Sequence, residues 1–208
     1  MNSKIPIFPL NLVMYPEAVY PLHIFEERYK KLINWCKTER EGFGIVSKID
    51  STISTVGCYV DVIEVINVFE NGSMDILVKG RERFQTTSTE LHPHGYIVAG
   101  VIPYFDDEQY SYPQPIEETT ITKFKDILDR TAVEFDKKYW NNFDRSVFKS
   151  FKIAEKSGLN LQQQQSLLLL RSETDRLRFL FKHFEKLEEY LDRKDVLKDI
   201  IAGDGYIN

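Results

Sequence analysis

The chain has 208 residues, enough for one large domain or two small ones with a sizeable core. Its 42% hydrophobic and 28% charged residues are typical of a globular protein, not of a disordered or membrane-spanning one. The formal net charge of −5 leaves no broad positive surface of the kind that nucleic-acid binding requires, so we expect no nucleic-acid partner.

The two cysteines and the absence of a long apolar run indicate the cellular setting. Cys36 and Cys58 are too few for a disulfide framework or a zinc-ligand set. Prolines interrupt the apolar N-terminus, and no run of about 18 apolar residues follows. We therefore expect a cytoplasmic protein without a membrane anchor, metal or cofactor.

The first half of the chain predicts a β-rich domain. Pro6 and Pro9 cannot donate to a ladder, so the first strand should lie at an edge or contain a bulge. Imperfect alternation in the third strand also predicts a bulge or a curled strand. Strands are expected over residues 5–10, 43–47, 58–70, 74–79 and 96–104.

Two local signals and one helix connect these strands. Asn71-Gly72 between apolar runs predicts a hairpin with a type I′ turn. Gly80 permits a sharp bend into Arg83. Helical spacing predicts one helix over residues 25–37, with an apolar face of Phe25, Tyr29, Leu32, Ile33 and Cys36.

The second half is helical. One apolar stripe runs from Ile121 to Tyr139 and is broken at Asn141-Asn142. A second stripe covers residues 147–154, and Asn160 is placed to cap the next helix. A capping-box pattern at residues 172–175 opens a long helix. The segment 106–115 is expected to be a linker, so we predict two domains, 1–112 and 113–208.

The order of these motifs resembles the substrate-recognition domain at the N-terminus of the Lon proteases. That family opens with a "PLFPL" strand, continues to a second "PL" segment and a helix bearing an arginine, and later carries a "DG…VLVEGxxRF" segment. A cadence of leucines in the helical half is also similar, from Leu159 to Glu188. The matching positions include Ile7-Phe8-Pro9-Leu10, Pro21-Leu22, Arg28-Tyr29, Gly57, Asn71-Gly72, Ile76 to Gly80 and Arg83-Phe84.

The resemblance implies an α+β fold, a PUA-like β-barrel with one embedded helix followed by a C-terminal helical bundle. Pro9, Pro21, Gly72, Gly80 and Arg83 are the residues that would mark this fold. A complete Lon protease adds an ATPase and a Ser-Lys peptidase after this region. The present sequence contains no G-x-x-x-x-G-K-[ST] phosphate loop and no surroundings of the family's serine nucleophile, so we expect no enzyme activity.

Other candidate chemistry is weak. His23 and Glu27 lie one helical turn apart, but the helical metal motif needs two histidines at that spacing. His92-Pro93-His94 has no third ligand nearby in the sequence, and a solvated loop is the simpler interpretation.

The expected function is binding of protein or unfolded polypeptide segments by a monomer or weak homodimer. Methionine and aromatic residues beside prolines make an adaptable apolar surface, although packing of the loop would need the same residue types. The alternative is an RNA- or small-ligand-binding protein, because relatives of the PUA-like fold bind RNA. The predicted peptide contacts are Met14, Tyr15, Tyr20, Tyr104 and Phe105.

Overall fold

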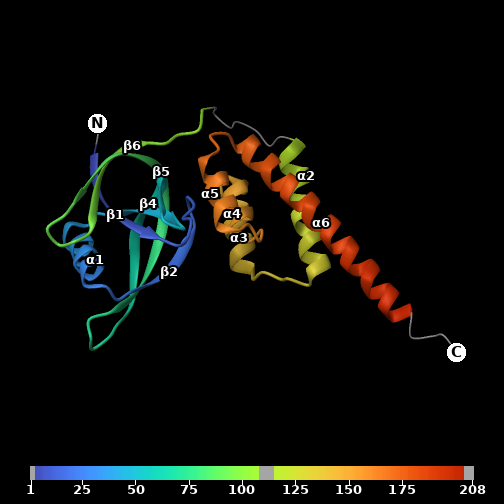
Figure 1. Ribbon diagram of the computed structural model, residues 1–208, viewed down its shortest axis with the longest axis horizontal. Helices are drawn as coiled ribbons and strands as arrows, with labels where there is room; N and C mark the ends of the chain where they lie inside the picture. The colour runs from blue at the N-terminus through green and yellow to red at the C-terminus, as the bar shows by residue number, and fades with distance from the viewer. Residues whose placement is uncertain (1–2, 108–114, 204–208) are drawn as a thin grey trace. The chain divides into compact units, whose positions relative to one another are not determined.

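The computed structural model describes residues 3–107 and 115–203, with side chains described over 4–107 and 115–194 (Figure 1). The fold is α+β and divides into two compact units. Unit 1 comprises Met1–Glu108 and Gly158–Arg171, and unit 2 comprises Gln109–Ser157 and Ser172–Asn208. The predicted boundary at residue 112 lies outside the described residues, and the helical half contributes residues 158–171 to unit 1.

A mixed six-stranded sheet forms the framework of unit 1. Its strand order is β2-β5-β4-β3-β1-β6, and β6 also pairs with β5. Five strands therefore pair in a closed cycle, while β2 extends from β5 as an edge strand. The strands are β1 (Ser3–Leu10), β2 (Val19–Ile24), β3 (Phe43–Ile49), β4 (Thr52–Val68), β5 (Met74–Leu91) and β6 (Ile97–Pro103).

The position of β1 corrects the expectation of an edge or bulged strand. It lies between β6 and β3 and pairs with β3 in parallel. However, Pro6 pairs only with Val98 of β6, and Pro9 pairs only with Val46 of β3. Each proline therefore has a neighbouring strand on one side only. This half-pairing accommodates residues that lack a backbone donor.

The predicted hairpin joins β4 to β5, but its turn is not type I′. Gly72 has φ 75°, whereas Asn71 is not among the described residues with positive φ, and type I′ requires both. The Asn71 side chain instead accepts hydrogen bonds from the backbone N–H (3.0 Å) and the hydroxyl (2.7 Å) of Ser73. The loop is closed by the amide of Phe69, which donates to the carbonyl of Ser73. Three register shifts between β4 and β5 confirm the predicted bulging of β4.

Gly80 is required for a close approach between two segments. A Cβ on Gly80 would lie 2.1 Å from the carbonyl oxygen of Tyr15. Its amide donates to Ala18, and its carbonyl accepts from the amide of Glu17. The loop before β2 is thus held against the middle of β5, and Pro21 follows in β2 opposite Leu77.

Helix α1 (Glu27–Glu39) covers part of the sheet in unit 1. Its buried face is the predicted one, except that Phe25 precedes the helix and is 63% exposed. The ring of Tyr29 stacks on Phe8 of β1, with centroids 3.7 Å apart. The remaining buried residues of the helix are Leu32, Ile33 and Cys36.

A second helix, α5 (Leu161–Leu169), completes unit 1 although it is distant in sequence. Asn160 and Gln163 form the capping box that starts it, which confirms Asn160 as the predicted cap. Gln165 is buried and joins two strands. It accepts from the hydroxyl of Ser47 (2.7 Å) and donates to the carbonyl of Val56 (3.1 Å).

Unit 2 consists of α2 (Pro115–Thr131), α3 (Lys137–Arg145), α4 (Lys149–Ala154) and α6 (Glu173–Gly203). Helix α2 lies alongside α6 (Figure 1). The first stripe is split at Ala132, which has φ 53°, rather than at Asn141-Asn142, so the predicted break is misplaced by one helix. Among the described residues, no helix combines the length and apolarity needed to cross a membrane.

Candidate functional site

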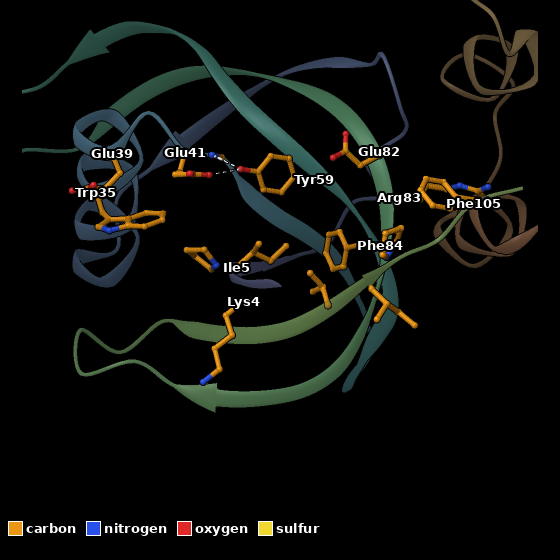
Figure 2. A pocket seen from close by; sticks show the side chains of 15 residues that line it. Lys4, Ile5, Trp35, Glu39, Glu41, Tyr59, Glu82, Arg83, Phe84 and Phe105 are labelled. Carbon is orange, nitrogen blue, oxygen red and sulfur yellow. Dashed lines mark hydrogen bonds between the residues drawn. The ribbon is translucent and has the colours of Figure 1, made fainter. Parts of the chain in front are cut away.

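An open groove of about 880 Å³ lies in unit 1, and all of its lining residues belong to that unit. The lining comes from β1, the end of α1, β4, β5 and β6, with Phe105 just beyond β6 (Figure 2). The groove is therefore assembled by pairing of the closed cycle of strands, not by a single loop. Sites at the mouths of closed sheets are a common location for ligands.

The floor of the groove is the hydrophobic core of the sheet. Phe84 and Val101 are buried in a core cluster, and Ile5 and Tyr59 are partly buried against it. Three large apolar side chains at the groove are more exposed: Trp35 at 37%, Ile102 at 36% and Phe105 at 64%. Apolar surface that remains this exposed beside a hollow can be buried by a ligand.

The groove is open because β1 has no neighbour on one side along its first half. Pairing between β1 and β3 begins only at Ile7, so residues 3–6 pair with β6 alone. On the β3–β4 side of the groove, the amide of Gly42 donates to the Tyr59 hydroxyl (2.6 Å), which donates to Glu41 (3.3 Å). Burial, the largest cause, raises the pKa of Tyr59, so its hydroxyl keeps its proton at neutral pH. A Cβ on Gly42 would lie 2.1 Å from the carbonyl oxygen of Val60, so the position requires glycine.

Carboxylates dominate the charge at the groove. Glu39, Glu41 and Glu82 line it and are all exposed. The two lining cations have their own acidic partners, since Lys4 pairs with Glu90 at 2.8 Å and Arg83 pairs with Asp106. The groove therefore presents an apolar floor with an acidic rim.

Arg83 anchors the helical segment of unit 1 to β5. One guanidinium nitrogen donates to the backbone carbonyls of Leu168 (2.6 Å) and Leu170 (2.7 Å). The other donates to Asp106, and the guanidinium lies 5.1 Å from the ring centre of Tyr104. Arg83 is only 6% exposed, so it supports the wall of the groove from behind and is not a surface contact.

The structure corrects the expected exposure of the first two predicted contacts. Met14 and Tyr15 are 2% and 1% exposed, because the loop that carries them packs against Gly80. The Tyr15 hydroxyl donates to the carbonyl of Gln164 at 3.3 Å. In this conformation both side chains pack the loop, the alternative considered from the sequence, and their role in peptide binding stays a prediction.

The other three predicted contacts do not form one patch. Tyr20 is half-buried on β2, and Tyr104 is half-buried with its hydroxyl donating to the carbonyl of Leu169 at 2.8 Å. Phe105 alone lines the groove. Their role in peptide binding stays a prediction. Sequence reasoning missed Trp35, Tyr59 and Ile102, because nothing local indicates that their elements converge.

The histidines considered from the sequence have other partners. Nδ1 of His23 lies 2.6 Å from Asp75, and this contact is the main cause that lowers the pKa of Asp75. The ring of His92 stacks on Tyr96, with centroids 4.3 Å apart. Within residues 4–107 and 115–194, no group of three or more histidine, cysteine or acidic side chains could hold a metal.

Comparison with known proteins gives a family for this fold. Residues 4–186 match the family described as the ATP-dependent protease La (LON) substrate-binding domain. The chain belongs to this family, which confirms the resemblance inferred from the sequence motifs.

Two solved structures have the same fold. The Lon N-terminal domain protein from Xanthomonas campestris superposes with a TM-score of 0.69 at 23% identity, covering 86% of this chain and 98% of the other. The N-terminal domain of Mycobacterium avium complex Lon protease superposes with a TM-score of 0.65 at 18% identity, covering 88% and 98%. At these identities the likeness establishes the fold alone.

Two curated relatives are named Lon protease. The Flavobacterium johnsoniae enzyme is 22% identical over 209 residues, which cover 89% of this chain and 25% of the relative. The Porphyromonas gingivalis enzyme is 28% identical over 109 residues, which cover 47% and 13%. The chain thus spans about a quarter or less of the length of these relatives.

Proposed function

We propose that this chain is a non-catalytic module that binds extended or unfolded polypeptide segments in the groove of unit 1. The observation that carries the proposal is an open apolar groove in a chain that belongs to a substrate-binding family. The matched region is that domain, and the ATPase and peptidase chemistry of the longer relatives is not assigned to it.

The lining of the groove suits a client without a fixed sequence. Trp35, Ile102 and Phe105 offer exposed apolar surface, and burial of such surface contributes roughly 25 cal/mol per Å². The first half of β1 also has strand pairing on one side only, so its other side is available for an extended segment. Apolar burial and main-chain pairing both tolerate many client sequences.

Several finer properties belong to the same proposal. The closed cycle of strands would be the PUA-like barrel of the family, and unit 2 would be its helical bundle. We also propose that the module works in the cytoplasm as a monomer or weak homodimer and requires no cofactor. The two-domain division at residue 112 would then separate the barrel from the helices in sequence, with α5 returning to unit 1.

A small-molecule ligand is the second candidate. The groove volume of about 880 Å³ falls within the roughly 300–1,000 Å³ range of small-molecule sites. RNA is less compatible, because three exposed carboxylates line the groove and would repel phosphates.

Fluorescence of Trp35 provides a direct test. The chain has two tryptophans, so a Trp140→Phe variant leaves Trp35 as the only one, beside the groove. Titration with neutral peptides of about ten residues, which span roughly 33 Å when extended, should give a saturable change. The peptides carry central leucine or phenylalanine and no tryptophan.

A matched pair of variants locates the binding. Ile102→Asp places a carboxylate on the apolar rim and should weaken binding by about tenfold or more. Leu91→Asp alters an equally apolar but 74% exposed side chain outside the groove and should leave affinity unchanged. Equal affinities for the two folded variants would contradict the groove as the site.

A further inference from the structure

We infer that the groove prefers polypeptide segments in which an apolar side chain is flanked by lysine or arginine. This inference rests on the proposed function and specifies its substrate class. Its basis is the negative charge of the lining carboxylates that form no ion pair within the described part of the chain.

Glu39 and Glu82 are the carboxylates without compensation. Neither has a salt bridge or hydrogen bond to another side chain among the residues that the structure describes, and both are exposed. Glu41 accepts a hydrogen bond from Tyr59, which holds its carboxyl group beside the groove. The lining cations Lys4 and Arg83 pair with acids of their own, so they do not neutralise this set.

The acidic groups flank the apolar floor. In the view of Figure 2, Tyr59 lies between Glu41 on the α1 side and Glu82 on β5. An extended segment that places an apolar side chain on Ile5 or Phe84 would therefore have its neighbours close to carboxylates. Side chains alternate along such a segment at about 3.3 Å per residue, so flanking cations can reach the rim.

Trp35 and Glu39 form a recognition pair for a cation. They are four residues apart in α1 and so lie on the same side of the helix. A guanidinium or ammonium over the exposed indole face would gain a cation–π contact and a nearby carboxylate together. An uncharged segment would gain only the apolar part of this contact.

The charge distribution favours a cationic segment over the other occupants. Phosphates of RNA would meet the same carboxylates and be repelled. A second copy of this chain carries a formal net charge of −5 and would bring its own acidic groove. Charge complementarity of this kind mainly sets specificity and the association rate, so the expected preference is moderate.

Three peptides of one design test the preference. Each has the same central phenylalanine, flanked by lysine, serine or glutamate, and binding is followed by Trp35 fluorescence in the Trp140→Phe background. We expect the lysine peptide to bind roughly fivefold more tightly than the serine peptide, since two exposed ion pairs each add a modest attraction. The glutamate peptide should bind most weakly, and high salt should shrink the differences.

Two double variants of equal charge change separate the groove from the net charge. Glu39→Gln with Glu82→Gln should bring the lysine-to-serine affinity ratio close to one. Glu64→Gln with Glu70→Gln alters exposed carboxylates on and beside β4, outside the groove, and should preserve the ratio.

The outcomes distinguish this inference from the proposed function. Equal binding of all three peptides would overturn the preference while supporting peptide binding. Equal loss of preference in both double variants would assign it to net charge and overturn the role of the groove. Failure of every peptide to bind the folded protein would overturn both proposals.

Discussion

Each unit contains a buried arginine, but the two arginines have different kinds of partner. Arg83 in unit 1 bonds to carbonyls 85 and 87 residues away and so fixes the chain behind the groove. Arg176 in unit 2 pairs with Glu173 within its own helix and with Ser150 of α4. Arg176 also lies 4.4 Å from the ring centre of Phe151.

The difference indicates how each unit is organised. Arg83 satisfies main-chain acceptors and joins segments distant in sequence, as the support of a preformed site requires. The Arg176–Glu173 pair is 0% exposed on both sides and fixes the packing of α6 on α4. Unit 2 has a recess of about 370 Å³ at α2 and α3, less than half the groove volume, so we place binding in unit 1.

The largest expected effect is in unit 2. Arg176→Met should lower the free energy of unfolding by about 3–5 kcal/mol, because it leaves the carboxylate of Glu173 buried without its cation. Urea unfolding followed by Trp140 fluorescence in a Trp35→Phe background measures this. Arg178→Met removes an exposed ion pair to Asp175 on the same helix and should cost less than about 1 kcal/mol. Similar midpoints for both variants would contradict the account.

The stability deficit of Arg176→Met should depend on pH. Burial is the main cause that raises the pKa of Glu173, so the folded state holds this proton more tightly than the unfolded chain does. Stability from a raised pKa is present below the unfolded-state value and is lost as pH rises through the folded-state value. Without Arg176 this loss should grow, so the deficit of Arg176→Met should widen from about pH 4 to pH 7. A stability deficit of Arg176→Met that narrows between these pH values would contradict a raised pKa of Glu173 in the folded state.

Arg83→Met should have the next largest effect. It removes the guanidinium that donates to two carbonyls and to the Asp106 carboxylate, and we expect a loss of about 3 kcal/mol. Cys36 and Cys58 are buried thiols in unit 1, and burial raises the pKa of each to about 12. Their rate of alkylation in urea therefore reports the opening of this unit. The neighbouring Arg81→Met alters an exposed pair with Asp61 and should leave the rate unchanged.

Gly80→Ala tests the contact that buries the loop before β2. The new Cβ would overlap the carbonyl of Tyr15, and overpacking of this kind costs about 1–3 kcal/mol. Thermal unfolding should show a lower melting temperature for Gly80→Ala. Thr87→Ala, on the exposed part of β5, should leave the melting temperature unchanged. An unchanged melting temperature for Gly80→Ala would mean that the loop is not held as described.

Tyr15→Phe should have the smallest effect. It removes the hydroxyl that donates to Gln164, at a cost of about 1 kcal/mol. Because Tyr15 is buried, peptide affinity should stay the same in the Trp35 titration. A clear drop in affinity without a loss of stability would restore Tyr15 as a contact.

Local signals explain how much of the fold was predictable. The Asn160 cap, the β4–β5 hairpin and the apolar face of α1 each depend on residues within a few positions. The family motifs added Arg83, but not its partners Leu168 and Leu170, which lie in the helical half. Both the type I′ turn and the break at Asn141-Asn142 were wrong, because other local bonds determined the backbone there.

The site was less predictable because its residues come from five separate elements. Phe105 was identified by residue type. Trp35 and Ile102 could be recognised as groove residues only from the tertiary structure, which brings α1 and β6 to the same groove. The burial of Tyr15 follows from a contact with Gly80, which is 65 residues away by the numbering and invisible to periodicity. Arg176 was missed because a fully buried arginine runs against the usual distribution of charged residues.

Mapping a bound peptide by amide NMR tests the central claim most directly. The isotopically labelled chain would be titrated with the neutral phenylalanine peptide, and backbone shifts would be assigned to residues. Our account predicts saturable shifts concentrated at Ile5, Trp35, Tyr59, Ile102 and Phe105, with unit 2 unaffected. Shifts confined to unit 2, or to surfaces of unit 1 away from these residues, would contradict the groove as the polypeptide-binding site.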